Sequence, residues 1–162
     1  MSVRLRVPAE ADVDLWTTLF DDPAVMRYIG TGEVRPREWY AAFVQRQQQL
    51  ADTAGLCLFS VLVEGGVAGF AGVHPWSHEW GPTGLPEIGW RLGRSFWGRG
   101  LATEAAHAVV SRARAAEVPR LISMIHEGNA ASMRVARKLG MATEAVLESP
   151  EGNRVHQLGL QL

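Results

Sequence analysis

Cysteine is nearly absent from this sequence, and it has neither an excess of one charge nor a long apolar run. The single cysteine, Cys57, excludes an internal disulfide framework and any metal site built from several thiolates. The 16 Lys and Arg residues against 17 Asp and Glu give a net charge of -1, so no overall positive field would attract nucleic acid or an anionic membrane. No apolar run reaches the ~18 residues that span a bilayer. We therefore expect a cytoplasmic protein that binds neither nucleic acid nor membranes.

The chain is long enough for one globular domain. It has 162 residues, of which 47% are hydrophobic and 20% charged, so we expect a single domain over residues 1–162. Residue periodicity and turn signals predict four helices, over 10–20, 23–29, 36–51 and 100–116, and a fifth over 129–139. Strands are predicted over 3–7, 56–63, 67–74, 87–92, 121–125, 142–147 and 155–160. This order predicts an α/β (α+β) fold in which helices come first, an antiparallel meander follows, and two helical crossovers complete one sheet.

A glycine-rich turn between a predicted strand and a predicted helix is the first candidate site. Residues 97–102 read WGRGLA, and two arginines, Arg94 and Arg99, bracket the turn. The N–H groups of such a turn and of the first helical turn can point at one anion, and glycine allows a phosphate to approach them. The alternative is an ordinary strand-to-helix turn with solvated arginines.

Two other phosphate-binding loops fit this sequence less well. A P-loop requires Gly-Lys-Ser/Thr, which the chain lacks. A Rossmann turn requires a third glycine where this sequence has Thr103. Glu117 is suitably placed for a ribose, but no second βαβ half follows, so dinucleotide binding is a distant alternative.

Two motifs carry a resemblance to a known family. Residues 94–105, RSFWGRGLATEA, resemble the acetyl-CoA pyrophosphate loop of the GNAT N-acetyltransferases, in their RimJ/RimL-like branch. Residues 129–141, NAASMRVARKLGM, resemble the Asn-x-x-Ser helix of that branch, which ends in Lys-Leu-Gly. Shorter matches at residues 4–6, 22–30 and 87–90 follow in family order, so the resemblance covers nearly the whole chain.

The resemblance implies a mostly antiparallel central sheet with a V-shaped splay, in which the strand over 87–92 parts from its neighbour. Acetyl-CoA, the implied co-substrate, would place its pantetheine arm in the V along that strand and its pyrophosphate on the glycine turn. The implied cofactor-binding residues are Trp90, Arg91, Leu92, Arg94, Trp97, Gly98, Arg99, Gly100, Leu101, Ala102, Thr103 and Asn129. Asn129 would hydrogen-bond the pantetheine, or it serves only as a helix N-cap, and both roles can hold in different states.

The resemblance also implies direct acetyl transfer in a ternary complex, from acetyl-CoA to a protein N-terminal α-amine or a small-molecule amine. The amine must be neutral to attack, and Glu87 lies roughly where relatives carry a catalytic glutamate, so Glu87 is the candidate base. Its alternative role is an exposed charge at a strand end. The tyrosine that many relatives use as general acid falls at Ala136, and Ser132 is the substitute. The missing tyrosine also leaves a non-catalytic acyl-CoA-binding module as the alternative function.

Other reactive side chains are assigned no role. Cys57 lies in an apolar strand without an adjacent basic residue, so its thiol should be inert and a ping-pong route through it is not expected. No metal is expected, because Pro75 prevents His74 and His78 from forming a helical pair of ligands. His126 either reaches the site or is satisfied by its neighbours at a strand end. We expect a monomer or a homodimer.

Overall fold

The computed structural model describes residues 2–162, which form seven strands, five α-helices and one short 3-10 helix. The helices are α1 (Asp12–Leu19), α2 (Pro23–Met26), α3 (Arg37–Ala54), η1 (Arg94–Phe96), α4 (Leu101–Ala115) and α5 (Ala130–Lys138). The strands are β1 (Val3–Arg6), β2 (Leu58–Val63), β3 (Gly66–Pro75), β4 (Pro86–Leu92), β5 (Arg120–His126), β6 (Ala142–Glu148) and β7 (Arg154–Gln161). Within residues 2–162, none of the helices combines the length and apolar character needed to cross a membrane.

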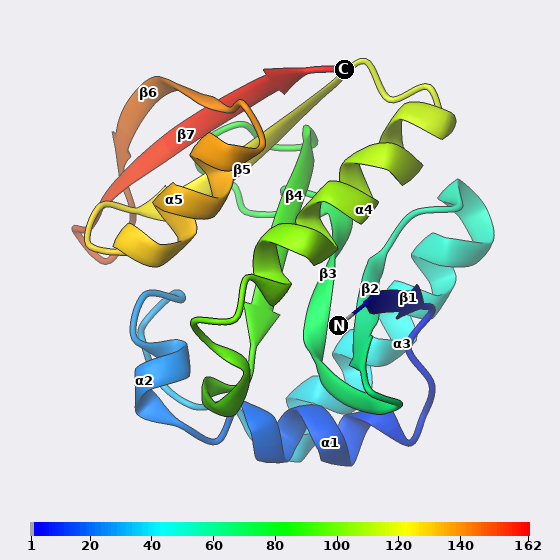
Figure 1. Ribbon diagram of the computed structural model, residues 1–162. Helices are drawn as coiled ribbons and strands as arrows, with labels where there is room; N and C mark the ends of the chain where they lie inside the picture. The colour runs from blue at the N-terminus through cyan, green and yellow to red at the C-terminus, as the bar shows by residue number, and fades with distance from the viewer. Residues whose placement is uncertain (1) are drawn as a thin grey trace.

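All the strands belong to one sheet, in the order β1-β2-β3-β4-β5-β7-β6 (Figure 1). Neighbouring strands run antiparallel, except for β4 and β5, which run parallel. A parallel pair needs a crossover connection, and here α4 provides it by packing on β3 and β4. The predicted mixed, mostly antiparallel sheet flanked by helices is confirmed.

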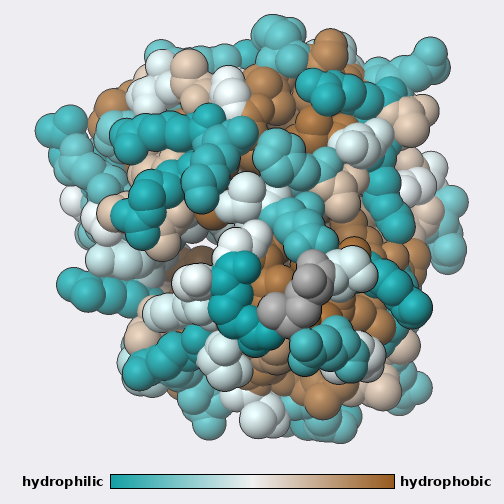
Figure 2. Space-filling view, viewed as in Figure 1, coloured by the Kyte–Doolittle hydropathy of each residue, from teal (hydrophilic) through white to brown (hydrophobic). Residues whose placement is uncertain are grey.

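The strands β4 and β5 part almost as soon as they meet. One residue pair, Glu87 with Ile122, joins them, whereas pairing runs along the whole of β4 against β3 and the whole of β5 against β7. Because the joined pair lies near the start of both strands, the gap opens toward their carboxyl ends. Figure 2 shows the surface notched on this side, between the part that carries α5 and the part that carries α2. This is the predicted V-shaped splay.

Two buried apolar clusters cover the two faces of the sheet. One lies under α4 and includes Ile88 and Leu92 of β4, and the other lies under α1 and α3 and includes Phe70 of β3. Side chains alternate between the faces of a strand. Glu87 and Arg91 of β4 therefore face α1 and α3, the side opposite α4. This alternation divides the candidate site into two halves.

Turn chemistry fixes the register of β2 and β3. Glu64 and Gly65 form a two-residue hairpin loop, and their φ angles of 52° and 83° both lie in the left-handed region, as type I′ turns require. The predicted two-residue hairpin is confirmed. At the preceding helix, Gly55 has a φ of 71° and ends α3 three residues beyond the predicted end at residue 51.

Candidate active site

The glycine turn lies at the open end of the V, where β4 leads through η1 into α4. Gly98 and Gly100 have φ angles of 72° and 74°, a backbone region that residues with side chains rarely adopt. Nothing lies within 4 Å of a Cβ built on either glycine, so the space beside the turn is open. Gly100 is the N-cap of α4 and provides no side-chain acceptor for the N–H groups of the first turn. The turn therefore presents backbone donors to open space, an arrangement suited to an anion.

The other residues of the turn are held in different ways. Arg94 donates from Nη2 to Asp22 Oδ1 at 2.7 Å, which ties the turn to the start of α2. The Arg99 guanidinium lies 5.9 Å from the centroid of the Phe96 ring, and the residue is exposed. Leu101, the first residue of α4, is buried, while Ala102 and Thr103 of the same turn are half-buried. The structure therefore brings the predicted pyrophosphate-binding residues together at one end of β4.

Trp97 reveals which backbone groups of β4 face the V. Its indole Nε1 donates to the Leu92 carbonyl at 2.9 Å, whereas the next N–H, that of Gly93, donates to Ala68 on the β3 side. Backbone polar groups of successive residues point to opposite sides of a strand. The N–H and carbonyl of Trp90, two residues before Leu92, therefore point toward the gap that β5 has left. A pantetheine arm in the V would meet unpaired backbone groups there.

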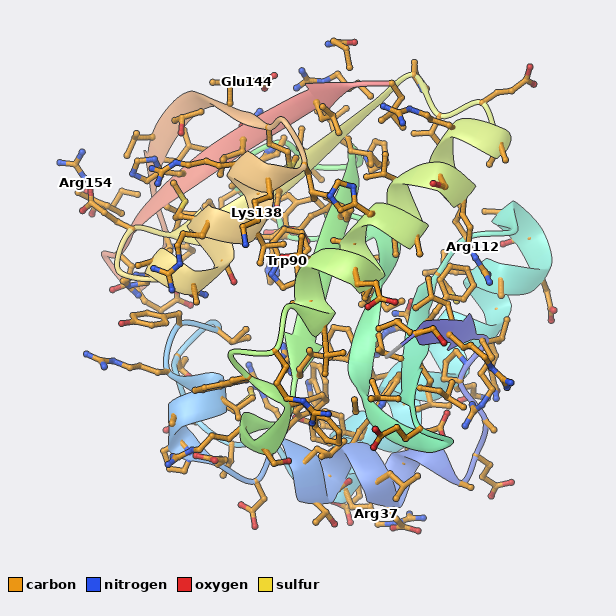
Figure 3. The ribbon with its side chains drawn as sticks, in the orientation of Figure 1. Arg37, Trp90, Arg112, Lys138, Glu144 and Arg154 are labelled. Atoms are coloured by element: carbon orange, nitrogen blue, oxygen red, sulfur yellow. The ribbon has the colours of Figure 1, made fainter. Side chains whose placement is uncertain are left out.

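Trp90 and Ser132 bridge the V. The Trp90 indole Nε1 donates to Ser132 Oγ at 3.3 Å, which joins β4 to the first turn of α5. Figure 3 shows the labelled Trp90 side chain next to α5. Asn129 Oδ1 accepts the N–H of Ser132 at 3.2 Å, so the N-cap interpretation of Asn129 is confirmed. The cap occupies the amide oxygen and leaves the amide nitrogen to donate to another group. The Ser132 oxygen accepts from Trp90, so its hydroxyl hydrogen is likewise left to donate.

Glu87 is buried, with 8% of the residue exposed, so the alternative of an exposed strand-end charge is wrong. His74, its cross-strand partner on β3, places Nε2 2.9 Å from Oε1 of the carboxylate. Oε2 accepts the N–H of Met124 at 3.0 Å, two residues beyond the last paired residue of β5. The carboxylate therefore takes the place of the strand hydrogen bond that β5 loses where the two strands part.

Sequence reasoning missed two contacts of the site. The sequence suggests a role for His74 only as a metal ligand. The register that pairs His74 with Glu87 cannot be predicted across the loop over 76–85. Tyr28, from the segment after α2, packs against the end of β5, with its ring centroid 5.0 Å from that of His126. His126 Nδ1 also accepts the N–H of Gly128 at 2.9 Å, so a neighbour at the strand end holds one nitrogen of this ring. No short sequence signal would have revealed either contact.

Cys57 is fully buried beside the sheet. Burial raises the pKa of its thiol to about 12, although Arg112 acts in the opposite direction. A thiol with such a pKa carries almost no thiolate at neutral pH, and the thiolate is the nucleophilic form. The burial and raised pKa of Cys57 support the prediction that its thiol is inert.

Comparison with known proteins agrees with this geometry. Residues 2–142 match the family described as the acetyltransferase (GNAT) domain. The chain is 34% identical over 145 residues to the uncharacterized protein YkkB of Bacillus subtilis. The aligned residues cover 86% of this chain and 81% of that protein. The fold is similar to that of RimL, a ribosomal L7/L12 α-N-protein acetyltransferase in complex with coenzyme A, with a TM-score of 0.84 and 18% identity over 100% of this chain and 95% of that one.

A second solved structure, that of yncA from Salmonella typhimurium with its cofactor acetyl-CoA, gives a TM-score of 0.78 and 20% identity over 100% of this chain and 95% of that one. At such identities these two likenesses show the fold. The family match extends from β1 to the start of β6 and includes both the glycine turn and the Asn129 helix. The sequence match and the parted β4–β5 pair together show that this chain belongs to the GNAT acetyltransferase family.

Proposed function

We propose that this chain transfers the acetyl group of acetyl-CoA to a primary amine by direct attack in a ternary complex. The observation that carries this proposal is the V between β4 and β5, with the turn of Gly98 and Gly100 at its open end. The acceptor is a protein N-terminal α-amine or a small-molecule amine. Cytoplasmic location and a monomeric or homodimeric state are part of the same proposal.

The cofactor half of the site is assigned to backbone groups and three side chains. The backbone from Trp90 to Leu92 would pair with the pantetheine, because the groups of Trp90 point into the V and lack a strand partner. The turn from Trp97 to Thr103 would hold the pyrophosphate on its N–H groups, with Arg94 and Arg99 beside it. Asn129 would donate from its amide nitrogen to the pantetheine while its oxygen caps α5. Acetyl-CoA supplies the activated acetyl group.

The acceptor half of the site is assigned to Glu87. A protonated amine cannot attack a carbonyl, so a base must take its proton, directly or through a water molecule. An α-amine has a typical pKa of ~7.7 to 8.0 against ~10.4 for lysine, so an α-amine needs less help near neutral pH. His74 and the N–H of Met124 hold the Glu87 carboxylate in one orientation. Glu87 is therefore the base, and His74 is the residue that positions it.

Ser132 is assigned as the acid. When the tetrahedral intermediate collapses, the departing sulfur needs a proton or a hydrogen bond. The Ser132 oxygen is held by the Trp90 indole at the edge of the V, and its hydroxyl hydrogen is left to donate. Ala136 stands where many relatives carry a tyrosine as the acid, and it has no polar group. Ser132 would therefore supply the proton or hydrogen bond to the departing sulfur.

The test measures thiol release from acetyl-CoA in the presence of a panel of primary amines, with product mass checked for one added acetyl group. Acetyl-CoA-dependent acetylation of at least one amine supports the proposal. Tight acetyl-CoA binding without thiol release in the presence of any α-amine, ε-amine or small amine would instead support an acyl-CoA-binding module. A thermal shift with NAD and none with acetyl-CoA would contradict both.

A further inference from the structure

Arg91 carries a guanidinium that no carboxylate of residues 2–162 neutralises. Its Nε and Nη1 atoms are buried and have no hydrogen-bond partner within the same residues. Its guanidinium lies 5.2 Å from the centroid of the Phe20 ring and 5.0 Å from that of Phe70, so the side chain extends under α1, on the face of β4 that also carries Glu87. Aromatic faces attract a cation, but they accept no N–H hydrogen bonds of full strength.

The charge on Arg91 persists at neutral pH. Burial lowers the pKa of its guanidinium, to about 10, which still lies well above 7. Leaving a buried donor without an acceptor costs about 1 to 3 kcal/mol, and more for a charged group. Most buried polar groups in folded proteins have partners, so two orphaned nitrogens on one charged side chain call for an external acceptor.

The same face of the sheet shows how this fold treats a buried charge that has only a structural role. Asp12 is fully buried, and its carboxylate accepts from Arg6 at 2.6 and 2.9 Å, from the Ala9 N–H at 2.9 Å and from Ser60 Oγ at 2.6 Å. Every side of that carboxylate is satisfied within the chain. Arg91 has no carboxylate partner among residues 2–162, and beside Tyr40 its Nε and Nη1 atoms stay unsatisfied.

The groups around Arg91 would also favour an anion. The Tyr40 hydroxyl is buried beside the Arg91 guanidinium, close enough for a hydrogen bond between the two side chains to act on the pKa of each. Burial raises the pKa of Tyr40, while the charge and hydrogen bond of Arg91 and the charge of Arg35 lower it. Asp21 acts on Tyr40 in the opposite sense, and no carboxylate of residues 2–162 bonds Arg91. The neighbouring Asp22 is engaged by Arg94.

We propose that Arg91, with Arg35 and Tyr40, binds an anionic group of the acceptor, a carboxylate or a phosphate. The guanidinium fork matches both groups and can donate two parallel hydrogen bonds. This inference rests on the proposed function, because it places the acceptor on the Glu87 face of β4. The two residues are four apart on one strand, which separates their Cα atoms by about 13 Å at ~3.3 Å per residue. The anionic group of the acceptor therefore lies several bonds from its amine.

The experiment compares two pairs of acceptors that differ in the anion alone. The first pair is 6-aminohexanoate and its amide, and the second is 6-aminohexyl phosphate and 6-aminohexanol. Binding is measured by calorimetry on protein saturated with coenzyme A, and kcat/KM is measured with acetyl-CoA. We expect at least a tenfold preference for one anionic member in both readouts, and the pair that shows it identifies carboxylate or phosphate.

Arg91→Met should reduce that preference to less than twofold without lowering the thermal midpoint, because it removes an unpaired buried charge. Arg46→Met is the matched control, since Arg46 also lies over an aromatic ring, that of Phe43, and is exposed on α3. It should keep the full preference. Arg35→Gln, at a partly exposed position, should weaken the preference several-fold and provides the test if Arg91→Met does not fold.

Equal binding of the acid and its neutral partner by the wild-type protein, or a preference that survives in Arg91→Met, would overturn the inference. Failure of the proposed function looks different. In that case no amine is acetylated, yet calorimetry on the protein saturated with coenzyme A still reports whether the anion binds.

Discussion

The two halves of the site along β4 are built from different material. The half at the V and the glycine turn consists mainly of backbone groups, presented by Gly98, Gly100 and the unpaired edge of Trp90. The half under α1 consists of side chains, Glu87 and Arg91, whose neighbours come from β3, β5, α1 and α3. A backbone site leaves a compact sequence motif because it demands glycine at fixed spacing. A side-chain site assembled from distant elements leaves none.

The largest expected effect comes from Glu87 on the side-chain half. Glu87→Gln keeps the size of the side chain, and an amide can satisfy both present contacts. Its oxygen can accept from Met124 and its nitrogen can donate to His74 in the other imidazole tautomer. The amide cannot take a proton, and general base catalysis is typically worth ~10² to 10⁴ in rate. We expect kcat to fall within that range while the acetyl-CoA dissociation constant and thermal midpoint barely change.

The loss should depend on the acceptor, which sharpens the comparison between the two halves. An amine that is already neutral at the assay pH needs no base, so its rate should fall less than that of a lysine-like amine. Steady-state kinetics with two amines of different basicity at neutral pH provide the measurement. Wild-type turnover of the lysine-like amine by Glu87→Gln would remove this carboxylate from the mechanism and leave water, or a carboxylate such as Glu79, as the base.

The next effect concerns the backbone half. Gly100→Val places a β-branched side chain at a φ of 74° and fills the open space beside the turn. We expect the acetyl-CoA dissociation constant, measured by calorimetry, to rise at least tenfold. Gly152→Val is the matched control, because Gly152 has a φ of 83° and open space around it in the turn between β6 and β7. It should cost similar backbone strain but leave affinity unchanged. An unchanged affinity in folded Gly100→Val would refute the assignment of this turn.

The sequence was informative where local rules decide the structure. The two-residue hairpin at Glu64 and Gly65, the order of the elements and the glycine turn follow from spacing and turn chemistry within a few residues. The burial of Glu87 could not be predicted, because it depends on the register of β3 against β4 across a ten-residue loop and on where β5 parts from β4. The sequence predicts that Arg91 binds the cofactor through its backbone. Only the tertiary structure shows that its side chain lies over Phe70, on the face of the sheet opposite α4.

A smaller effect is expected at Asn129, where the two roles can be separated. Asn129→Asp keeps an oxygen that caps α5 but loses the amide N–H, and Asn129→Ala loses both. One hydrogen bond between neutral groups is worth about 0.5 to 1.5 kcal/mol, so acetyl-CoA affinity should fall several-fold in both variants. The thermal midpoint should fall in Asn129→Ala alone, because a lost N-cap costs about 0.5 to 2 kcal/mol. Normal affinity in both folded variants would leave only the capping role.

The smallest effect on activity is expected from a substitution of Cys57. An unchanged rate in that variant would favour direct transfer over a covalent route through the thiol. The pKa of about 12 leaves roughly one thiol in 10⁵ ionised at pH 7, so an acetyl-cysteine intermediate should not form. Cys57→Ala should keep kcat and kcat/KM within twofold of wild type and lower the free energy of unfolding by about 1 kcal/mol, the cost of a small buried cavity. Intact mass spectrometry after mixing with acetyl-CoA alone provides the decisive measurement. One added acetyl group in the wild type that is absent from Cys57→Ala, together with lost turnover in the variant, would replace the ternary complex by a ping-pong mechanism.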